Sequence, residues 1–182
     1  YACGENYERI KKLPSIESIL EKGWDVLCLT QDVDEFSLKA LMSYNEKEFR
    51  SAAEEDVLLD DDKKSELQKL SEENKELLDN IKDALADISS VKLSARLKSH
   101  PVCITREGEI TLEMEKVINS MPNGQKIFAK RVLEINPNHE MFSVLKSLDK
   151  EKLSDYAKLL YNEALLIEGM DIPDPVEFSS LI

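Results

Sequence analysis

The stretch Val91–Thr105, VKLSARLKSHPVCIT, decides the fold class because it reads as two strands joined by a turn. Its first half alternates apolar with other residues, the period-2 pattern of a strand with one buried face. The alternating residues are Val91, Leu93, Ala95 and Leu97. Ser-His-Pro at 99–101 predicts the turn, and the apolar run at 102–105 predicts the second strand.

A helix and a third strand follow these two strands. The segment 108–125, GEITLEMEKVINSMPNGQ, has apolar residues at helical spacing and ends in a Pro-Asn-Gly turn signal. The stripe consists of Ile110, Met114, Val117, Ile118 and Met121, and Leu112 points the other way. RVLEINP at 131–137 predicts the third strand. A β-β-α-β order places the helix across the sheet, so its inner side should be covered while the wider stripe stays accessible.

The first 53 residues predict a small α-β-α unit. Residues 5–22 are expected to form a helix broken at Leu13, because the residue before a proline avoids the helical region, and Gly23 is expected to end this helix. WDVLCLT at 24–30 predicts a short buried strand, and an acidic helix start follows it. No glycine-rich turn follows the strand, so no phosphate cradle is encoded. The charged segment 54–64 is the expected connection to a second, helix-rich domain at 65–182.

That second domain is expected to begin with a long amphipathic helix at 65–88. Its apolar residues keep heptad spacing, with Asn74 at a position where another apolar residue is expected. The apolar positions are Leu67, Leu70, Leu77, Ile81, Ala84 and Ile88. One interpretation is a helix packed on its own domain, and the alternative is a coiled-coil adaptor or scaffold that binds a partner through this helix.

The last third predicts a helix capped by Asp149 and running to about Glu168, then a final helix that begins at Asp174-Pro175. Both helices are apolar over more than one side, which favours a symmetric helix-to-helix dimer of four helices. The expected interface residues are Leu153, Ala157, Leu160, Ala164, Leu165, Ile167, Phe178, Leu181 and Ile182. The fold class is therefore α+β: the small unit, a three-stranded sheet with helices, and a helical dimerisation bundle.

Composition excludes several classes of function. The net charge of −13 repels nucleic acid, and no apolar run is long enough to span a membrane. Cys3, Cys28 and Cys103 form no C-x-x-C pair, which favours a reducing, cytoplasmic setting. No metal-ligand cluster or catalytic constellation is encoded. The sequence therefore predicts a binding and assembly module that is not an enzyme.

Several segments, in order along the whole chain, resemble the ninety-kilodalton heat-shock chaperones, in particular the bacterial branch. They are YACGENYERIKKLPSIESILEKGWDVLCLTQDVDEF at the start, KSHPVCIT, the helix with Gly124-Gln125-Lys126, LEINPNH, and YAKLLYNEALLIEGMDIPDPVEF at the end. The resemblance implies the end of the middle domain followed by the C-terminal domain of such a chaperone. The start at Tyr1 rather than methionine suggests a piece of a longer protein.

The resemblance also implies partners and site residues. Members are ATP-driven dimers, and ATP and Mg²⁺ are expected for the full-length protein and not for this fragment. The last two helices are expected to dimerise. Non-native client proteins are expected to contact an acidic-aromatic pair and the apolar helix, with Phe36 in place of the usual tryptophan. These positions are Glu35, Phe36, Ile110, Met114, Val117 and Ile118.

Overall fold

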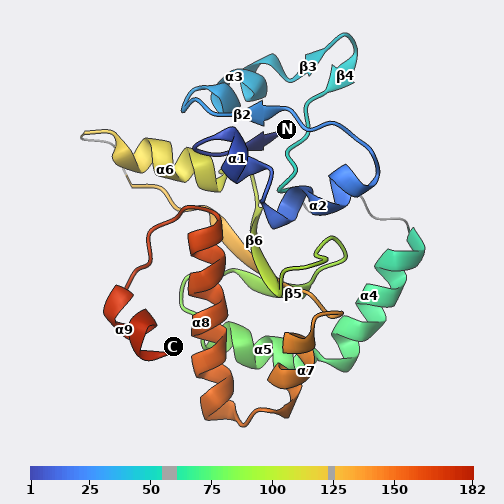
Figure 1. Cartoon of the computed structure of the whole chain (residues 1–182), viewed down its shortest axis with the longest axis vertical. Helices are drawn as coiled ribbons and strands as arrows, with labels where there is room; N and C mark the ends of the chain where they lie inside the picture. Colours follow the sequence, from blue (N-terminus) through green and yellow to red (C-terminus); the bar gives the residue numbers. More distant parts are fainter. Residues whose placement is uncertain (55–60, 123–125) are drawn as a thin grey trace.

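The computed structural model describes residues 1–54, 61–122 and 126–182, with the side chains of 61–64 left out. Its first unit contains two parallel strands of two residues each, three helices and an antiparallel hairpin (Figure 1). The elements are β1 Ala2–Cys3, α1 Tyr7–Ile10, α2 Pro14–Glu21, β2 Cys28–Leu29, α3 Asp34–Leu41, β3 Ser43–Tyr44 and β4 Lys47–Glu48. The expected helix break at Leu13 and the end of α2 at Gly23, with φ of 72°, are confirmed.

The second unit is a three-stranded sheet with six helices in the described residues (Figure 1). The elements are α4 Asp61–Glu73, α5 Lys75–Asp83, β5 Ser90–Leu93, β6 Val102–Glu107, α6 Leu112–Ser120, β7 Lys130–Ile135, α7 Glu140–Ser147, α8 Lys150–Ile167 and α9 Pro175–Ser180. The strand order is β5-β7-β6, so the last strand lies in the centre. The α+β class and the β-β-α-β order are confirmed.

The path of α6 differs from the sequence expectation. β6 and β7 are antiparallel neighbours, and Glu107 at the end of β6 pairs with Lys130 at the start of β7. The chain therefore leaves and re-enters the sheet at the same end, and no crossing over the sheet is needed. α6 projects from that end and lies beside the first unit instead of covering the sheet (Figure 1).

The predicted helix at 65–88 is two helices, and the coiled-coil interpretation is wrong. The backbone leaves helical geometry at Asn74, with φ of −112° and ψ of 20°, and the Asn74 side chain donates to the carbonyl of Leu70 at 2.7 Å. Leu67, Leu70 and Leu77 pack against the chain's own core. Of the expected connection 54–64, residues 55–60 lie outside the described residues, and 61–64 begin α4.

The two faces of the sheet have different chemistry. One face carries Val102, Ile104, Leu133 and Ile135, which pack with α5 and α8 in the main core. The opposite face carries Cys103, Thr105 and Glu134, all buried. None of the described helices is both long and apolar enough to cross a membrane.

A buried ion pair occupies that second face. The Arg96 guanidinium bonds both carboxylate oxygens of Glu134, and Arg96 Nε donates to Glu134 Oε2 at 3.0 Å. Ser94 and Thr105 hydroxyls donate to the same carboxylate at 2.6 and 3.0 Å. Burial would raise the pKa of Glu134, but the Arg96 contact and the two hydroxyls outweigh it and hold the pKa below 4.5.

Replacing Arg96 with Met should reduce the free energy of unfolding by about 3–5 kcal/mol, because Glu134 would be left buried without its partner. Urea unfolding measures this change. Lys98→Met is the matched control, since it removes an exposed pair with Glu21 and should cost less than about 1 kcal/mol. Equal losses of unfolding free energy in Arg96→Met and Lys98→Met would contradict the assignment of Arg96 as the partner that compensates the buried Glu134.

The same pair predicts a pH effect of defined sign. A carboxyl with a lowered folded-state pKa stabilises the fold fully above its unfolded pKa, about 4.5 for Glu134. That stability is lost as the pH falls further, through the folded-state pKa. Glu134→Gln should therefore flatten the fall in unfolding free energy below pH 4.5, measured by urea titrations at several pH values.

Candidate functional site

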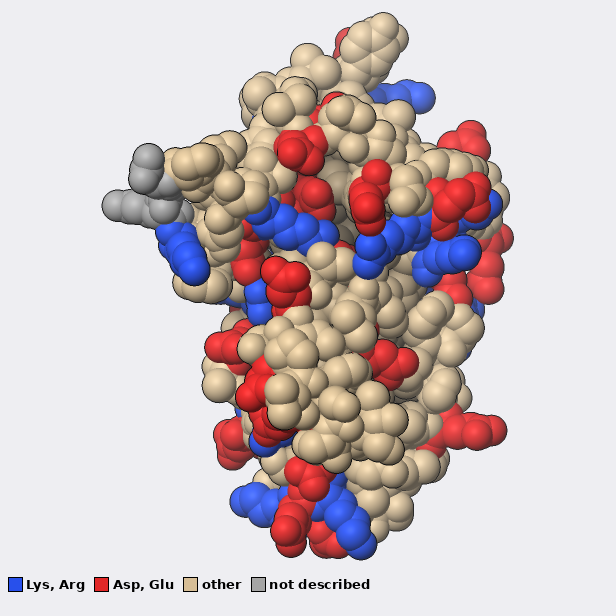
Figure 2. Space-filling model, turned by 60° about the vertical axis from the view of Figure 1, so that its left-hand side comes forward, with Lys and Arg blue, Asp and Glu red and all other residues tan. Residues whose placement is uncertain are grey.

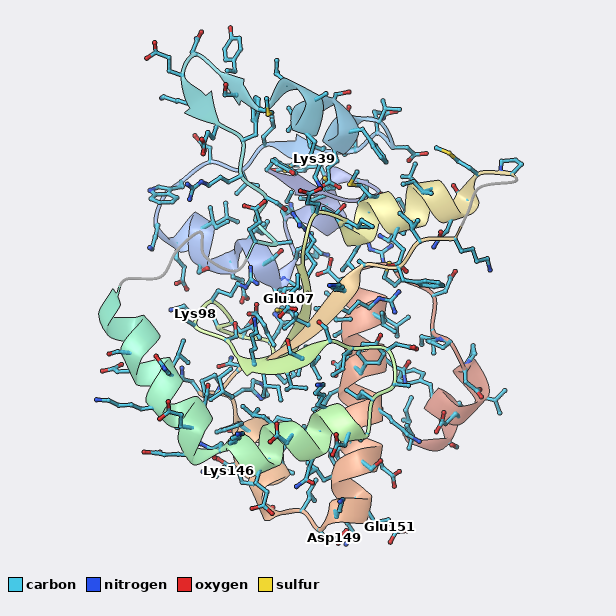
Figure 3. All side chains as sticks on the ribbon, turned by 180° about the vertical axis from the view of Figure 1, so that it is seen from behind. Lys39, Lys98, Glu107, Lys146, Asp149 and Glu151 are labelled. Atoms are coloured by element: carbon cyan, nitrogen blue, oxygen red, sulfur yellow. The ribbon has the colours of Figure 1, made fainter. Side chains whose placement is uncertain are left out.

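The candidate site lies where α3 of the first unit meets the start of α6. Glu35 is buried, and its carboxylate accepts from the Thr111 hydroxyl at 2.5 Å and from the Tyr1 hydroxyl at 3.3 Å. Thr111 caps α6 by accepting from the Met114 amide at 3.0 Å. The Lys39 ammonium donates to the Glu109 carbonyl, and Figure 3 shows Lys39 at this junction. Glu35 therefore fixes the position of α6 rather than facing solvent.

The inner side of α6 is held by polar contacts. Glu115 is buried, accepts from the Ala129 amide at 2.7 Å and pairs with Arg131 at 2.5 Å. Asn119 exchanges two hydrogen bonds with the backbone of Ile127, at 2.8 and 2.9 Å. A helix fixed at its start and along its inner side presents its outer side in one orientation.

The outer side of α6 carries part of the predicted stripe. Ile110 is 37% exposed, Met114 and Ile118 are half-buried, and Val117 is buried. Ile110 and Met114 border an open groove of about 830 Å³ whose other walls include Lys39, Arg106 and three glutamates. The expectation that Leu112 is covered agrees with the structure, whereas Val117 does not belong to the accessible surface.

Two further apolar residues near α6 are exposed. Met121 and Phe128 lie at the far end of α6 and in the segment that leads into β7, and both are more than half exposed. Phe128 lies outside any regular element, so helical or strand periodicity gave no signal for it. Phe36, next to Glu35, is half-buried.

The second predicted surface is on α8 and α9. Leu153, Ala157 and Leu160 are buried in the chain's own core, as are Ala164 and Leu165. Ile167 packs against the core of the first unit, while Phe178 and Leu181 are half-buried. The stripe on α8 that was expected to face a partner therefore faces the sheet, because a wide apolar helix buries its best-packed side first.

The outer apolar residues are different ones. Leu166 is 46% exposed and Val176 is 80% exposed, and Ile182 is the most exposed large apolar residue in the described chain. An ion pair of 2.6 Å between Lys158 and Glu177 holds α9 beside α8. Figure 2 shows uncharged residues over much of the lower half of this side, below a band of acidic and basic side chains.

Comparisons with known proteins agree with one family. A sequence model described as "Hsp90 protein" matches residues 1–182. The chain is 53% identical to the chaperone protein HtpG of Bacillus velezensis over 186 residues and 52% identical to that of Bacillus subtilis over 190 residues. HtpG of Clostridium botulinum is 52% identical over 187 residues. These matches cover 99–100% of this chain and 30% of each relative.

The matches overturn the prediction that the chain is not an enzyme. That prediction rested on missing catalytic motifs and on a position outside the ATPase machinery, whereas one Hsp90 model matches every residue. The chain spans about 30% of the length of its relatives, so a search for motifs within it does not exclude enzymatic activity. Matched by this model over its full length and by HtpG at 52–53% identity, the chain belongs to the Hsp90 family of heat-shock chaperones.

Proposed function

We propose that this chain contributes the client-contacting and self-associating surfaces of a bacterial chaperone of the HtpG type. In this proposal residues 1–53 correspond to the end of the middle domain and residues 65–182 to the C-terminal domain. The observation that carries it is the apolar outer side of α6, which is held rigid by Glu35, Thr111 and Glu115 and left partly uncovered.

The client surface consists of Ile110, Met114, Ile118, Met121 and Phe128. Ile110 and Met114 border the groove with charged walls, so an extended non-native segment would find apolar contacts and nearby hydrogen-bonding groups there. Met114 and Met121 are unbranched and adapt to varied partners. Glu35 and Val117 are buried, so in this proposal they support the surface without touching a client. Contact between Phe36 and a client stays a prediction.

Replacing Ile110 and Met114 together with Asn should weaken binding of an unfolded client at least several-fold, because both apolar contacts are lost. Fluorescence anisotropy with a labelled, permanently unfolded client measures the dissociation constant. The melting temperature should change little, since Ile110 is exposed and Met114 only half-buried.

Val144→Asn is the matched control for this experiment. Val144 is 38% exposed, like Ile110, but lies on α7 at the other end of the molecule (Figure 1). Client affinity should be unchanged in the control. The proposal fails if both variants bind the client equally well, or if the double variant loses binding only because it unfolds.

We also propose a homodimer through the outer side of α8 and α9. The supporting observation is that Leu166, Val176 and Ile182 are all exposed, and exposed apolar surface of this kind marks interaction sites. A specific dimer buries on the order of 1,600 Å² in total, and this surface with its half-buried neighbours Phe178 and Leu181 would form its centre.

Replacing Leu166 and Val176 together with Asp should convert a dimer at micromolar concentration into a folded monomer. Sedimentation velocity measures the mass, and circular dichroism checks the fold. Leu20→Asp is the control: Leu20 is also 46% exposed, but it lies on α2. Leu160→Asp tests core packing instead and should unfold the chain. A wild-type monomer would contradict the proposal.

The cofactors of the whole protein are proposed to be ATP and Mg²⁺. The cavity between the two units does not fit the anionic phosphates of a nucleoside triphosphate. Five carboxylates line it, and its three basic side chains already have acidic partners. In the described residues no group of three His, Cys, Asp or Glu side chains is placed to hold a metal ion. The three free thiols fit a cytoplasmic setting for this chaperone.

A further inference from the structure

A partly open cavity of about 300 Å³ lies between the two units and shares Arg106 with the groove beside the proposed client surface. The first unit contributes β1, α1 and residues 51–53, and the second contributes the end of β6, the start of α6 and the end of α8. Ile10, Leu13 and Leu112 form apolar walls. Gly169 follows α8 with φ of 69°, and a Cβ there would approach the Arg9 guanidinium to 3.0 Å.

Two of the three basic side chains around the cavity, Arg9 and Lys116, are already engaged. Arg9 pairs with Glu5 at 2.9 Å and donates to the Leu166 carbonyl at 3.1 Å. Lys116 pairs with Glu113 at 3.1 Å and donates to the backbone carbonyl of Glu168 at 2.7 Å. These contacts use the charges of Arg9 and Lys116 within the protein.

Arg106 is engaged only in part. Its side chain is 8% exposed and pairs with Glu54 at 3.4 Å. Its Nε–H is buried and has no acceptor among the described residues. A buried donor without a partner is costly, so an oxygen atom from a bound molecule would satisfy it.

The Glu168 carboxylate faces the same cavity and makes no hydrogen bond or ion pair within the described part of the chain. Burial raises the pKa of this carboxyl to about 7, and Lys116, Arg96 and Arg9 oppose the shift only partly while Glu113 adds to it. Lys116 donates to the backbone carbonyl of Glu168, not to its carboxylate. The carboxylate therefore lacks a cation of its own.

We propose that this cavity binds a small organic cation of the arginine or lysine type, with a guanidinium or ammonium group on Glu168 and a carbonyl oxygen near Arg106. The apolar walls accept the aliphatic part of such a group. Its source is either a free amine or a basic side chain of a peptide, since both present the same charged end. An ion pair on Glu168 would link the end of α8 to Arg106 on β6 through one ligand.

Isothermal titration calorimetry on the 182-residue chain tests the site with Nα-acetyl-arginine N-methylamide. The matched probe with citrulline in place of arginine has the same shape but no charge. The arginine probe should bind at least tenfold more tightly at pH 8. Free L-arginine, which keeps the guanidinium and an oxygen for Arg106, distinguishes the source: equal or tighter affinity assigns a free amine, and weaker affinity assigns a peptide side chain.

Two variants and a pH series complete the test. Glu168→Gln should abolish the preference for the charged probe, whereas Glu163→Gln, on an exposed position of the same helix, should leave it unchanged. Because the Glu168 carboxylate forms as the pH rises through about 7, affinity should rise about tenfold from pH 6 to pH 8 in the wild type and stay flat in Glu168→Gln. Equal binding of both probes, or an unchanged Glu168→Gln, overturns the proposal.

Discussion

The buried pair of Arg96 and Glu134 is the constraint on which the rest of the molecule depends. The pair makes one face of a small sheet polar, so helices cannot cover that face as they cover the other. Arg96 also donates to the carbonyls of Ala52 and Glu54, at 3.0 and 3.2 Å, where the first unit ends. The Arg96 guanidinium thus neutralises the buried Glu134 carboxylate on the central strand. The same guanidinium hydrogen-bonds the end of the first unit to the second. Buried carboxylates need this kind of compensation.

The antiparallel pairing of β6 and β7 has an equally direct effect on the position of α6. It returns the chain to the same end of the sheet, so α6 stands out beside the first unit and keeps an uncovered side. The polar anchors Glu35, Thr111 and Glu115 then set its orientation. The proposed client surface on this helix would owe its exposure to topology and its rigidity to hydrogen bonds.

Local signals in the sequence predicted the elements that depend on neighbouring residues. The caps Asp149 and Asp174, the break before Pro14 and the glycine at the end of α2 all form as expected. Non-local partners were not predictable in this way. The pairing of β1 with β2 joins residues 26 positions apart over two residues each, which leaves no periodic signal.

The same limit explains the errors at the candidate site. An apolar stripe on a helix indicates burial but not which neighbour provides it, so the α8 stripe was assigned to a partner although the sheet covers it. The family resemblance implied that Glu35 contacts clients, whereas its carboxylate is buried and accepts from the Thr111 and Tyr1 hydroxyls. Leu166 and Val176 can be identified as the exposed apolar residues only once the side of α8 that the sheet covers is known.

The contact between Glu35 and Thr111 has a mechanical consequence. It joins a helix of the first unit to the cap of the helix that carries the apolar strip, and Lys39 adds a second attachment one turn further along α3. A rotation of the first unit would therefore load the start of α6, while the contacts of Glu115 and Asn119 hold the rest of the helix against the segment that leads into β7. The hydrogen bond between Glu35 and Thr111 would carry that load, so this one contact couples the two units mechanically.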